Sequence, residues 1–391
     1  MAAGSDRDDP ECLNEESDAK EVNVLPQLTR IVEAVNRLAP QELAESWDRV
    51  GLQVNRYESG ISRVLVALDL NGPVIQEGRE HQVDGFIIHH PFLFKPLTQI
   101  DPTEPSMQIL ANLIKNDQFV FVAHTNMDKA ERGINQYLAE ILGLTRIKVL
   151  EPAAVPTSKI VVFTPASHRE AIREAMAAAG AGEIGDYREC SFESSGTGTF
   201  RPGSLSHPYV GQPDNLEAVA EVRLEMVVDQ ARVNRVLAAV YQNHPYEEPV
   251  VDVYSLMNRS RHGLGRIGDL EETIPLQTIW KLIKSKLRVE TLKTSGEPEQ
   301  MISRIAICSG SGGSLISQAI RQHADLYLTG ELNYHDHWAA REAGLAVIEA
   351  GHWATESCFV SLIAEYLEET FDGDALHIIR SGVTGEPYQM V

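Results

Sequence analysis

The sequence predicts an α/β protein: a two-lobed scaffold with largely parallel sheets, plus an inserted α+β domain of the ferredoxin-like kind. Near both ends of the chain, short and continuously apolar runs alternate with segments of helical periodicity. Such alternation is typical of βαβ units and a parallel sheet. The middle of the chain differs, because residues 221–228 alternate with period two, as a half-exposed strand does. Its β-α-β and β-α-β order indicates a ferredoxin-like module.

These changes of pattern divide the chain into four regions. Residues 1–21 are acidic and almost without apolar side chains, which is typical of a disordered tail. We expect a first lobe over residues 22–152, the inserted domain over 153–261 and a second lobe over 262–391. The boundary after the first lobe falls in the segment 151–156, which is rich in proline and alanine.

The elements of the first lobe follow from periodicity and from helix-breaking residues. Leucine, isoleucine and valine recur at helical spacing from Leu28 to Leu38, and Pro40 ends that helix. Continuous apolar runs predict buried strands at residues 63–68, 84–88 and 119–123. Helices are expected between and after them, from about Pro73 and over residues 105–116 and 133–142.

The inserted domain and the second lobe are interpreted in the same way. In the insert we expect strands at residues 159–163, 221–228 and 250–256, helices at 168–179 and 231–242, and a turn region rich in glycine and serine at 194–203. In the second lobe a loop at 262–268 precedes helices at 275–287, 315–322 and 335–343 and strands at 304–308, 326–329 and 345–348.

Composition limits the classes of partner. The 391 residues carry a formal net charge of −22, so no basic field would attract nucleic acid. A local basic or metal-bearing pocket could still hold a nucleotide. The four cysteines, at 12, 190, 308 and 358, show no CxxC spacing, which favours reduced thiols in a cytoplasmic protein. We find neither a signal peptide nor an apolar run long enough to span a membrane.

Side chains able to bind metals follow three of the predicted strands. The pairs are His89 and His90, His124 and Asp128, and His352 and Glu356. In parallel sheets, functional residues gather at the carboxyl ends of strands. A helix beginning after Gly351 would also place His352 and Glu356 on one face, one turn apart.

Each pair also has a purely structural interpretation. Adjacent strand residues point to opposite faces, so His89 and His90 serve one site only where the strand breaks, and Pro91 helps to break it. A loop residue such as Asp128 is more often a turn or cap residue than a ligand. Taken together, the imidazoles and carboxylates exceed the needs of one tetrahedral site and suit two cations sharing a bridging group, such as Zn, Fe, Mn or Co.

Four motifs then occur in a fixed order. They are His89-His90-Pro91, the Ala-His-Thr-Asn-Met-Asp of residues 123–128, Thr329-Gly330-Glu331 and the Ala-Gly-His-Trp-Ala-Thr-Glu of residues 350–356. In this order they resemble the GTP cyclohydrolase I type 2 homologue family, also called the NGG-interacting-factor-three-like or dinuclear-metal hexameric family. The resemblance covers about residues 25–150 and 262–391. The inserted part resembles the PII-like or CutA-like module of longer members, through the motif His-Pro-Tyr-Glu-Glu-Pro at residues 244–249.

The resemblance implies a site and an assembly. It implies that two divalent metal ions per subunit (Zn, Fe or Mn) are bound by His89, His90, Asp128, His352 and Glu356. It also implies a toroidal homohexamer with the metal sites facing an inner cavity. The activity implied by the family name is opening of the imidazole ring of GTP by an activated water, which releases formate and yields 7,8-dihydroneopterin triphosphate.

Two other functions remain open from the sequence. One is a dinuclear-metal phosphoesterase, and the other is a metal-binding regulatory or scaffold protein without turnover. For a hydrolase, the candidate proton carriers or supporting groups beside the metals are His124, Glu331 and His335, although histidines at helix starts are often surface residues.

A glycine-rich segment and four basic residues are the candidates for phosphate contacts. The glycine-rich segment 309–314 would fit either a phosphate cradle or a tight βα turn, and the turn is favoured because no lysine completes a Walker pattern. Candidate partners of a triphosphate are Lys95, Lys129, Arg132 and Arg266. We interpret His244-Pro245-Tyr246 as a packing corner rather than a ligand-sensing loop.

Overall fold

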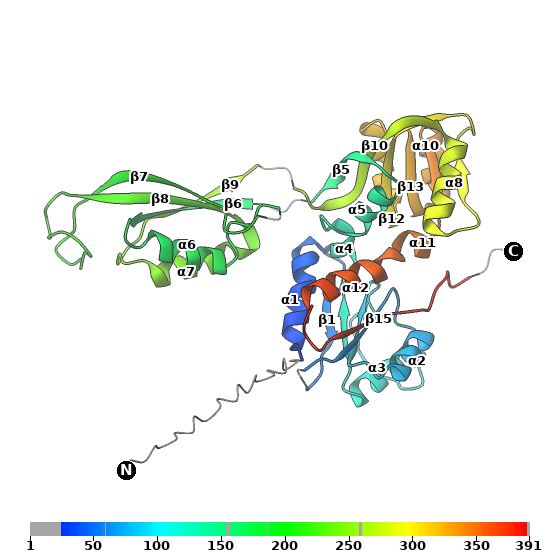
Figure 1. Ribbon diagram of the computed structural model, residues 1–391, viewed down its shortest axis with the longest axis horizontal. Helices are drawn as coiled ribbons and strands as arrows, with labels where there is room; N and C mark the ends of the chain where they lie inside the picture. The colour runs from blue at the N-terminus through cyan, green and yellow to red at the C-terminus, as the bar shows by residue number, and fades with distance from the viewer. Residues whose placement is uncertain (1–24, 59, 154–156, 186, 258–259, 389–391) are drawn as a thin grey trace, which may run out of the picture.

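A computed structural model describes residues 25–58, 60–153, 157–185, 187–257 and 260–388. The predicted acidic tail at residues 1–21 and residues 154–156 of the boundary segment lie outside these residues. The described part of the chain contains three sheets, each with its own helices (Figure 1). The predicted α/β class is confirmed.

The first sheet has five strands in the order β1-β4-β3-β2-β15. Their bounds are β1 Gly51–Val54, β2 Arg63–Ala67, β3 Gly85–Ile88, β4 Phe119–Val122 and β15 His377–Arg380. Strands β15, β2, β3 and β4 are parallel, and β1 is antiparallel to β4. The predicted strands β2, β3 and β4 are confirmed to within one residue, whereas the sequence analysis missed β1 and β15, which are short and lie at the two edges.

The described chain up to residue 141 contains five α-helices, four of them at predicted positions. They are α1 Leu28–Leu38, α2 Gly72–Glu80, α3 Pro105–Lys115, α4 Thr125–Lys129 and α5 Ile134–Ile141. The exception is α4, because a loop was expected around Asp128. Asn71 caps α2 by accepting from the N–H of Val74 at 3.1 Å, and Pro73 stands in the first turn, where its missing N–H costs nothing.

The second sheet has six strands in the order β11-β14-β13-β12-β10-β5. Their bounds are β5 Thr145–Pro152, β10 Gly263–Pro275, β11 Lys293–Ser295, β12 Met301–Ser311, β13 Leu326–Glu331 and β14 Ala346–Glu349. Only β12, β13 and β14 are mutually parallel. The flanking helices are α8 Leu276–Leu287, α9 Ile316–Arg321 and α10 Tyr334–Glu342.

Two predictions about this sheet were wrong. The expected loop at residues 262–268 is the start of β10, and the expected turn at 309–314 begins inside β12. In both cases glycines suggested a loop. Gly265 and Gly310 do have positive φ values, of 66° and 57°, but both lie within a strand. There they leave room for the Ile307 carbonyl oxygen and the Glu356 carboxylate, respectively.

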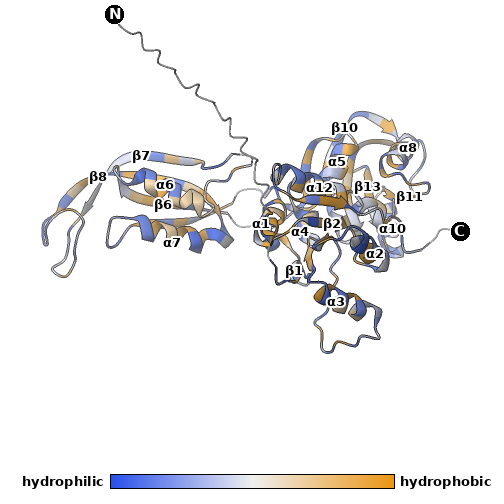
Figure 2. Ribbon diagram, turned by 60° about the horizontal axis from the view of Figure 1, so that its bottom comes forward, coloured by the Kyte–Doolittle hydropathy of each residue, from blue (hydrophilic) through white to orange (hydrophobic). Residues whose placement is uncertain are grey.

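The third sheet is antiparallel, in the order β7-β8-β6-β9. The chain runs through β6 Thr157–Pro165, α6 Arg169–Ala178, β7 Ser191–Phe200, β8 Glu217–Asp229, α7 Val233–Asn243 and β9 Val251–Leu256. This is the ferredoxin-like arrangement that the element order predicted. Hydrophilic and hydrophobic residues are mixed along α6 and α7, which pack one side of each helix onto the sheet (Figure 2).

The predicted turn region at residues 194–203 was also wrong, because most of it is strand β7. The Ser/Gly/Thr sequence of β7 has no apolar face that could reveal a strand, and most of its residues are exposed. β7 is held by its ladder to β8, which runs from Ser191 to Phe200.

One core joins the first two sheets. Helix α12 (Cys358–Thr370) contributes Phe359, Ile363 and Leu367 to a cluster that contains Phe121 of β4 and Leu328 of β13. In Figure 1, α11 (His352–Glu356) and α12 lie between the two sheets. The carboxyl ends of β3, β4, β12, β13 and β14 therefore meet along one line, which we call the seam.

Candidate metal centre

The seam brings together all five predicted metal ligands. His89 and His90 follow β3, Asp128 lies on α4 after β4, and His352 and Glu356 lie on α11 after β14. Three groups of side chains have potential ligand atoms within 4.8 Å of one another: His89 with His90 and His124, His90 with His352 and Glu356, and His89 with Asp128 and Glu356. Residues from both lobes thus form one cluster that could hold metal ions.

His89 has the feature most specific to a metal ligand. Its side chain is fully buried, and its Nδ1–H donates to the carbonyl oxygen of Ala123 at 2.8 Å. That bond leaves a lone pair on Nε2, which is buried and has no hydrogen-bond partner in the described structure. Nε2 lies 3.8 Å from Asp128 Oδ1 and 3.8 Å from Glu356 Oε1. A buried unpaired nitrogen costs about 1–3 kcal/mol, and a cation between these three atoms would remove that cost.

The carboxylate of Glu356 divides the cluster into two halves. Its Oε1 faces His89, whereas its Oε2 lies 2.9 Å from His90 Nε2 and 3.1 Å from His352 Nε2. Each oxygen therefore faces its own set of potential ligands. A carboxylate that is buried, with 3% of the residue exposed, and faces imidazoles on both sides has the chemistry of a bridging ligand.

All four histidines of the cluster are oriented by an oxygen acceptor at Nδ1. The acceptors are the Ala123 carbonyl for His89, Asp69 for His90, Asp48 for His124 and Glu331 for His352, at distances of 2.8, 2.8, 2.9 and 3.1 Å. Metal-binding histidines almost always have such a partner, which fixes the tautomer that leaves Nε2 for the cation. The pattern therefore fits a metal centre better than a set of packed or solvated rings.

The wall behind Asp128 and Glu356 comes from β12. Ser309 Oγ donates to Asp128 Oδ1 at 3.1 Å, and Ser309 N–H donates to Asn135 Oδ1 at 2.8 Å. At Gly310, whose φ is +57°, an added Cβ would lie 2.1 Å from Glu356 Oε1. Only glycine leaves room for this carboxylate, so the backbone here is shaped around the cluster.

The electrostatics of the cluster depend on histidine–carboxylate pairs. Burial lowers the pKa of His90, but hydrogen bonds to Asp69 and Glu356 outweigh it and raise the pKa to about 10. The hydrogen bond to Glu356 likewise raises the pKa of His352 to about 9. Burial raises the pKa of Asp128, whereas its histidine partners hold the pKa of Glu356 well below the usual value despite burial. Without a metal, protonated His90 and His352 therefore face the ionised carboxylate of Glu356.

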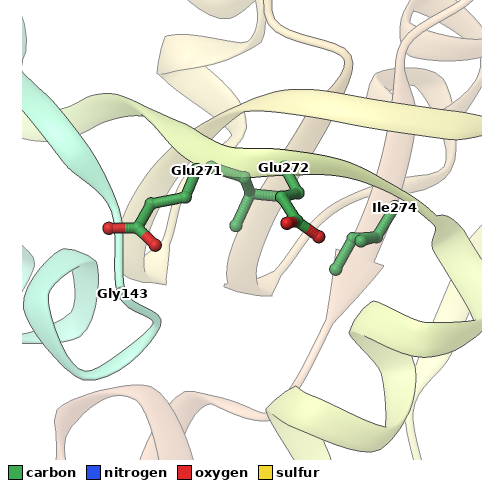
Figure 3. A pocket seen from close by; sticks show the side chains of 5 residues that line it. Gly143, Glu271, Glu272 and Ile274 are labelled. Carbon is green, nitrogen blue, oxygen red and sulfur yellow. The ribbon is translucent and has the colours of Figure 1, made fainter.

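An aromatic surface borders the open side of the cluster. The Trp47 ring lies 6.1 Å from the His124 ring in an edge-on arrangement and 6.0 Å from the Phe94 ring. Trp47 is 54% exposed and Phe94 45% exposed. A separate cavity of about 400 Å³ lies elsewhere, between Gly143 and the β10 residues Glu271, Glu272 and Ile274 (Figure 3). It contains none of the predicted site residues.

The structure places only some of the remaining candidate residues at the cluster. His124 lies in the cluster, and Glu331 supports His352. His335, in contrast, is exposed on α10 and belongs to none of the three groups found among the described residues. For segment 309–314 the phosphate cradle was the less favoured interpretation, and its N–H groups are partly used within the protein, since Gly310 N–H donates to Thr355.

The candidate triphosphate partners differ in burial and in the groups that they already contact. Arg266 is 1% exposed and donates to the carbonyl oxygens of Ala130, Gly263 and Gly265, so its proposed contact with a triphosphate is wrong. Lys129 pairs with Glu45 at 2.6 Å. Lys95 is exposed. In the insert, His244 Nε2 donates to the Phe163 carbonyl at 3.0 Å, which confirms its packing role.

Sequence reasoning missed three supporting residues. Asp69 follows β2, so its place at a strand end was a usable signal. Asp48 lies in a loop without any periodic pattern, yet its carboxylate accepts from His124 and from the N–H and hydroxyl of Thr125. Asn135 is a helix residue whose side chain links Ser309 to the Asp128 carbonyl. Nothing local in the sequence marks Asp48 or Asn135.

The fold and the site define an α/β protein with a buried histidine–carboxylate cluster between two sheets. The sequence model of the Duf34/NIF3 family (NGG1p interacting factor 3) matches residues 26–387, so the chain belongs to this family. The resemblance inferred from the four motifs is confirmed.

Relatives match over nearly the whole chain. A protein of Halalkalibacterium halodurans named GTP cyclohydrolase 1 type 2 homolog is 35% identical over 365 residues, which cover 92% of this chain and 98% of the relative. A Bacillus subtilis protein of the same name is 36% identical over 83% of this chain and 88% of its own length. The crystal structure of a Bacillus cereus protein related to NIF3 matches with a TM-score of 0.82 and 35% identity, covering 94% of this chain and all of that one.

None of the helices in the described ranges combines the length and the apolar character needed to cross a bilayer.

Proposed function

We propose that this chain is a dinuclear metal-dependent hydrolase whose substrate is a small nucleotide. The observation that carries the proposal is the position of Glu356 between two sets of nitrogen and oxygen donors. His89 and Asp128 face one of its oxygens, and His90 and His352 face the other. Bound there, two divalent ions (Zn, Fe or Mn) would activate water and polarise the substrate.

The side chains around the cluster supply the proton-transfer groups. His124 is 17% exposed at its side chain and is held by Asp48, whose carboxylate also accepts from the N–H of Arg49 and from the N–H and hydroxyl of Thr125. An imidazole held in this way can accept a proton from water and later donate it to a leaving group. Glu331 holds His352 through Nδ1 and is half exposed, so it is a positioning residue and a second route for protons to solvent.

A planar base fits the surface beside the cluster. Trp47 lies next to His124 and Phe94 lies next to Trp47, and both rings are partly exposed. Aromatic rings stack well on heteroaromatic bases. The name of the relatives points to GTP, so the proposed reaction is opening of the guanine imidazole ring with release of formate. Lys95, which follows Phe94 and is exposed, is the proposed partner of the triphosphate. We also propose the toroidal homohexamer that the family resemblance implies.

The test measures formate release from GTP. Purified protein loaded with Mn, Zn or Fe is compared with His352→Ala and with His81→Ala, a histidine at the exposed end of α2. We expect His352→Ala to lose turnover and metal while the assembly, measured by light scattering, is unchanged, and His81→Ala to keep both. Trp47→Ala should raise KM for GTP with little change in metal content.

Two other outcomes would replace the proposal. Release of phosphate without formate would favour a phosphoesterase that uses the same metals. Full metal loading without turnover of any nucleotide would favour a regulatory or scaffold protein.

A further inference from the structure

A second cavity lies where the insert meets the two lobes. It has a volume of about 540 Å³, within the range of pockets that hold small molecules. Its walls come from the end of α1, the loop after α4 and residues 260–262 before β10. From the insert they include the start of β6, the end of β8, residues 183–185 and Arg188. In Figure 1, α1 lies on the side of the lobes nearest to the insert.

Arginines dominate the lining of this cavity. Five of them face three carboxylates, in a chain whose formal net charge is −22; they are Arg37, Arg132, Arg188, Arg232 and Arg261. Two are paired, because Arg232 lies 2.9 Å from Glu183 and Arg261 lies 3.1 Å from Glu131. Among the described lining residues, Asp229 is then the only carboxylate left for the other three guanidinium groups. The cavity is a local positive region in an acidic protein.

The wall on the lobe side is held by hydrogen bonds. The buried guanidinium of Arg266 donates to the carbonyl oxygens of Ala130 at 2.7 Å and Glu131 at 3.4 Å. The N–H of Glu131 donates to His262 Nδ1 at 3.2 Å. At Gly133 an added Cβ would lie 1.9 Å from the Met127 carbonyl oxygen, so the loop is tightly wound. The backbone that carries Arg132 is therefore fixed before any ligand binds.

We propose that this cavity is a binding site for a small phosphorylated ligand. Guanidinium groups recognise phosphate oxygens through paired, charge-assisted hydrogen bonds, and three of them converge here from both sides of the junction. Tyr366 of α12 and Leu38 of α1 add an apolar wall suited to the non-phosphate part of such a ligand. The site is separate from the metal centre, although Arg132 stands only four positions after Asp128.

The test is calorimetric titration of the full-length chain, freed of metal by a chelator, with inorganic pyrophosphate and in parallel with ADP. We expect one saturable site per chain and a marked loss of affinity with added salt. The triple variant Arg37→Gln, Arg132→Gln, Arg188→Gln should bind about tenfold more weakly or worse. The control triple Arg79→Gln, Arg235→Gln, Arg321→Gln removes the same charge at exposed positions outside the cavity and should bind as the unmodified protein does.

Two further variants make the result specific. Arg188→Gln alone, on the insert side, and the pair Arg37→Gln, Arg132→Gln, on the lobe side, should each weaken binding if both sides form the site. His352→Ala should leave pyrophosphate binding unchanged, because that histidine belongs to the metal centre. If ADP binds more tightly than pyrophosphate, the cavity recognises a nucleotide. If the two bind equally, it recognises the phosphate groups alone.

The proposal is overturned if no saturable binding of either ligand occurs, or if the two triple variants bind equally. Binding that disappears in His352→Ala would also overturn it, since the anion would then occupy the metal centre. Metal content and turnover are measured on the same samples, so a failure here is distinct from a failure of the proposed hydrolase function.

Discussion

Glu356 in the seam and Glu225 in the insert are both buried carboxylates, with 3% and 8% of the residue exposed. Their partners differ in kind. Glu225 accepts from Lys159 Nζ at 2.8 Å and pairs with Arg223, and the hydrogen bond from Lys159 leads the causes that lower its pKa. Glu356 is surrounded by imidazoles instead. Fixed cations satisfy a buried carboxylate permanently, whereas histidines can give up their protons and let a metal ion take that role.

The largest expected effect is that of Glu356→Gln. Glu356→Gln removes the negative charge that faces both halves of the cluster. It should lower metal affinity by more than about a hundredfold, because mutation of a residue that only orients a metal ligand already lowers that affinity about 10–100-fold. Metal content by elemental analysis and formate release from GTP would both fall. Glu225→Gln is the matched control and should leave the metal content unchanged. Equal metal content in Glu356→Gln and Glu225→Gln would contradict the claim that Glu356, unlike Glu225, is needed to bind metal.

Gly310→Ala should act by steric exclusion rather than by a change of charge. The new methyl would lie 2.1 Å from Glu356 Oε1, and its backbone has a φ of +57°. Gly143→Ala, with a φ of +72° and nothing within 4 Å, carries the backbone strain alone, about 1–2 kcal/mol. We therefore expect Gly310→Ala to lose more free energy of unfolding than Gly143→Ala in urea titrations, and to lose metal as well. A Gly310→Ala protein with full metal content would show that the cluster does not need this space.

Metal binding should be linked to protons. The pKa values of about 10 for His90 and about 9 for His352 mean that both rings are protonated at pH 7 in the metal-free protein. Because a metal binds the neutral ring, uptake should release protons, and affinity should rise with pH up to about these values. Calorimetry in buffers of different ionisation enthalpy measures the release; a binding heat independent of buffer would count against these ligands.

The same two pKa values predict the opposite trend for stability. Both are raised above the ordinary value of 6.5, so their contribution to the metal-free protein is complete below that pH and is lost as pH rises through 9 and 10. Thermal unfolding of chelator-treated protein between pH 6 and pH 10.5 checks this. A midpoint that rises over the upper part of that range would mean that the imidazoles are not paired with Glu356, Asp69 and Glu331 as described.

The smallest effect is expected from Asp69→Asn. Asp69 is 51% exposed at its side chain and only orients His90. The loss of metal affinity should therefore be about tenfold, the lower end of the range for residues that orient a metal ligand. Competition with a fluorescent chelator measures it, with Asp372→Asn, on the exposed turn after α12, as the reference. A loss as large as that of Glu356→Gln would mean that Asp69 is itself a ligand.

The sequence by itself determined the candidate metal ligands, which follow strands. Buried strands appear as continuous apolar runs, and His89, His90, Asp128, His352 and Glu356 stand where those runs end. Local patterning also predicted the ferredoxin-like order of the insert. It failed at β7, where an exposed strand has no apolar period, and at β10 and β12, where glycines were interpreted as loop residues.

Only the tertiary structure decided that the two strand-end groups meet. His90 and Glu356 are 266 positions apart and lie within hydrogen-bond distance because α12 packs between two sheets whose carboxyl ends face each other. The tertiary structure also decided that Asp48 orients His124, that Arg266 is buried and that Arg132 lines the cavity between the insert and the two lobes. The physical reason is that periodicity reports which face of an element is buried, whereas partners across a seam depend on how separate elements pack.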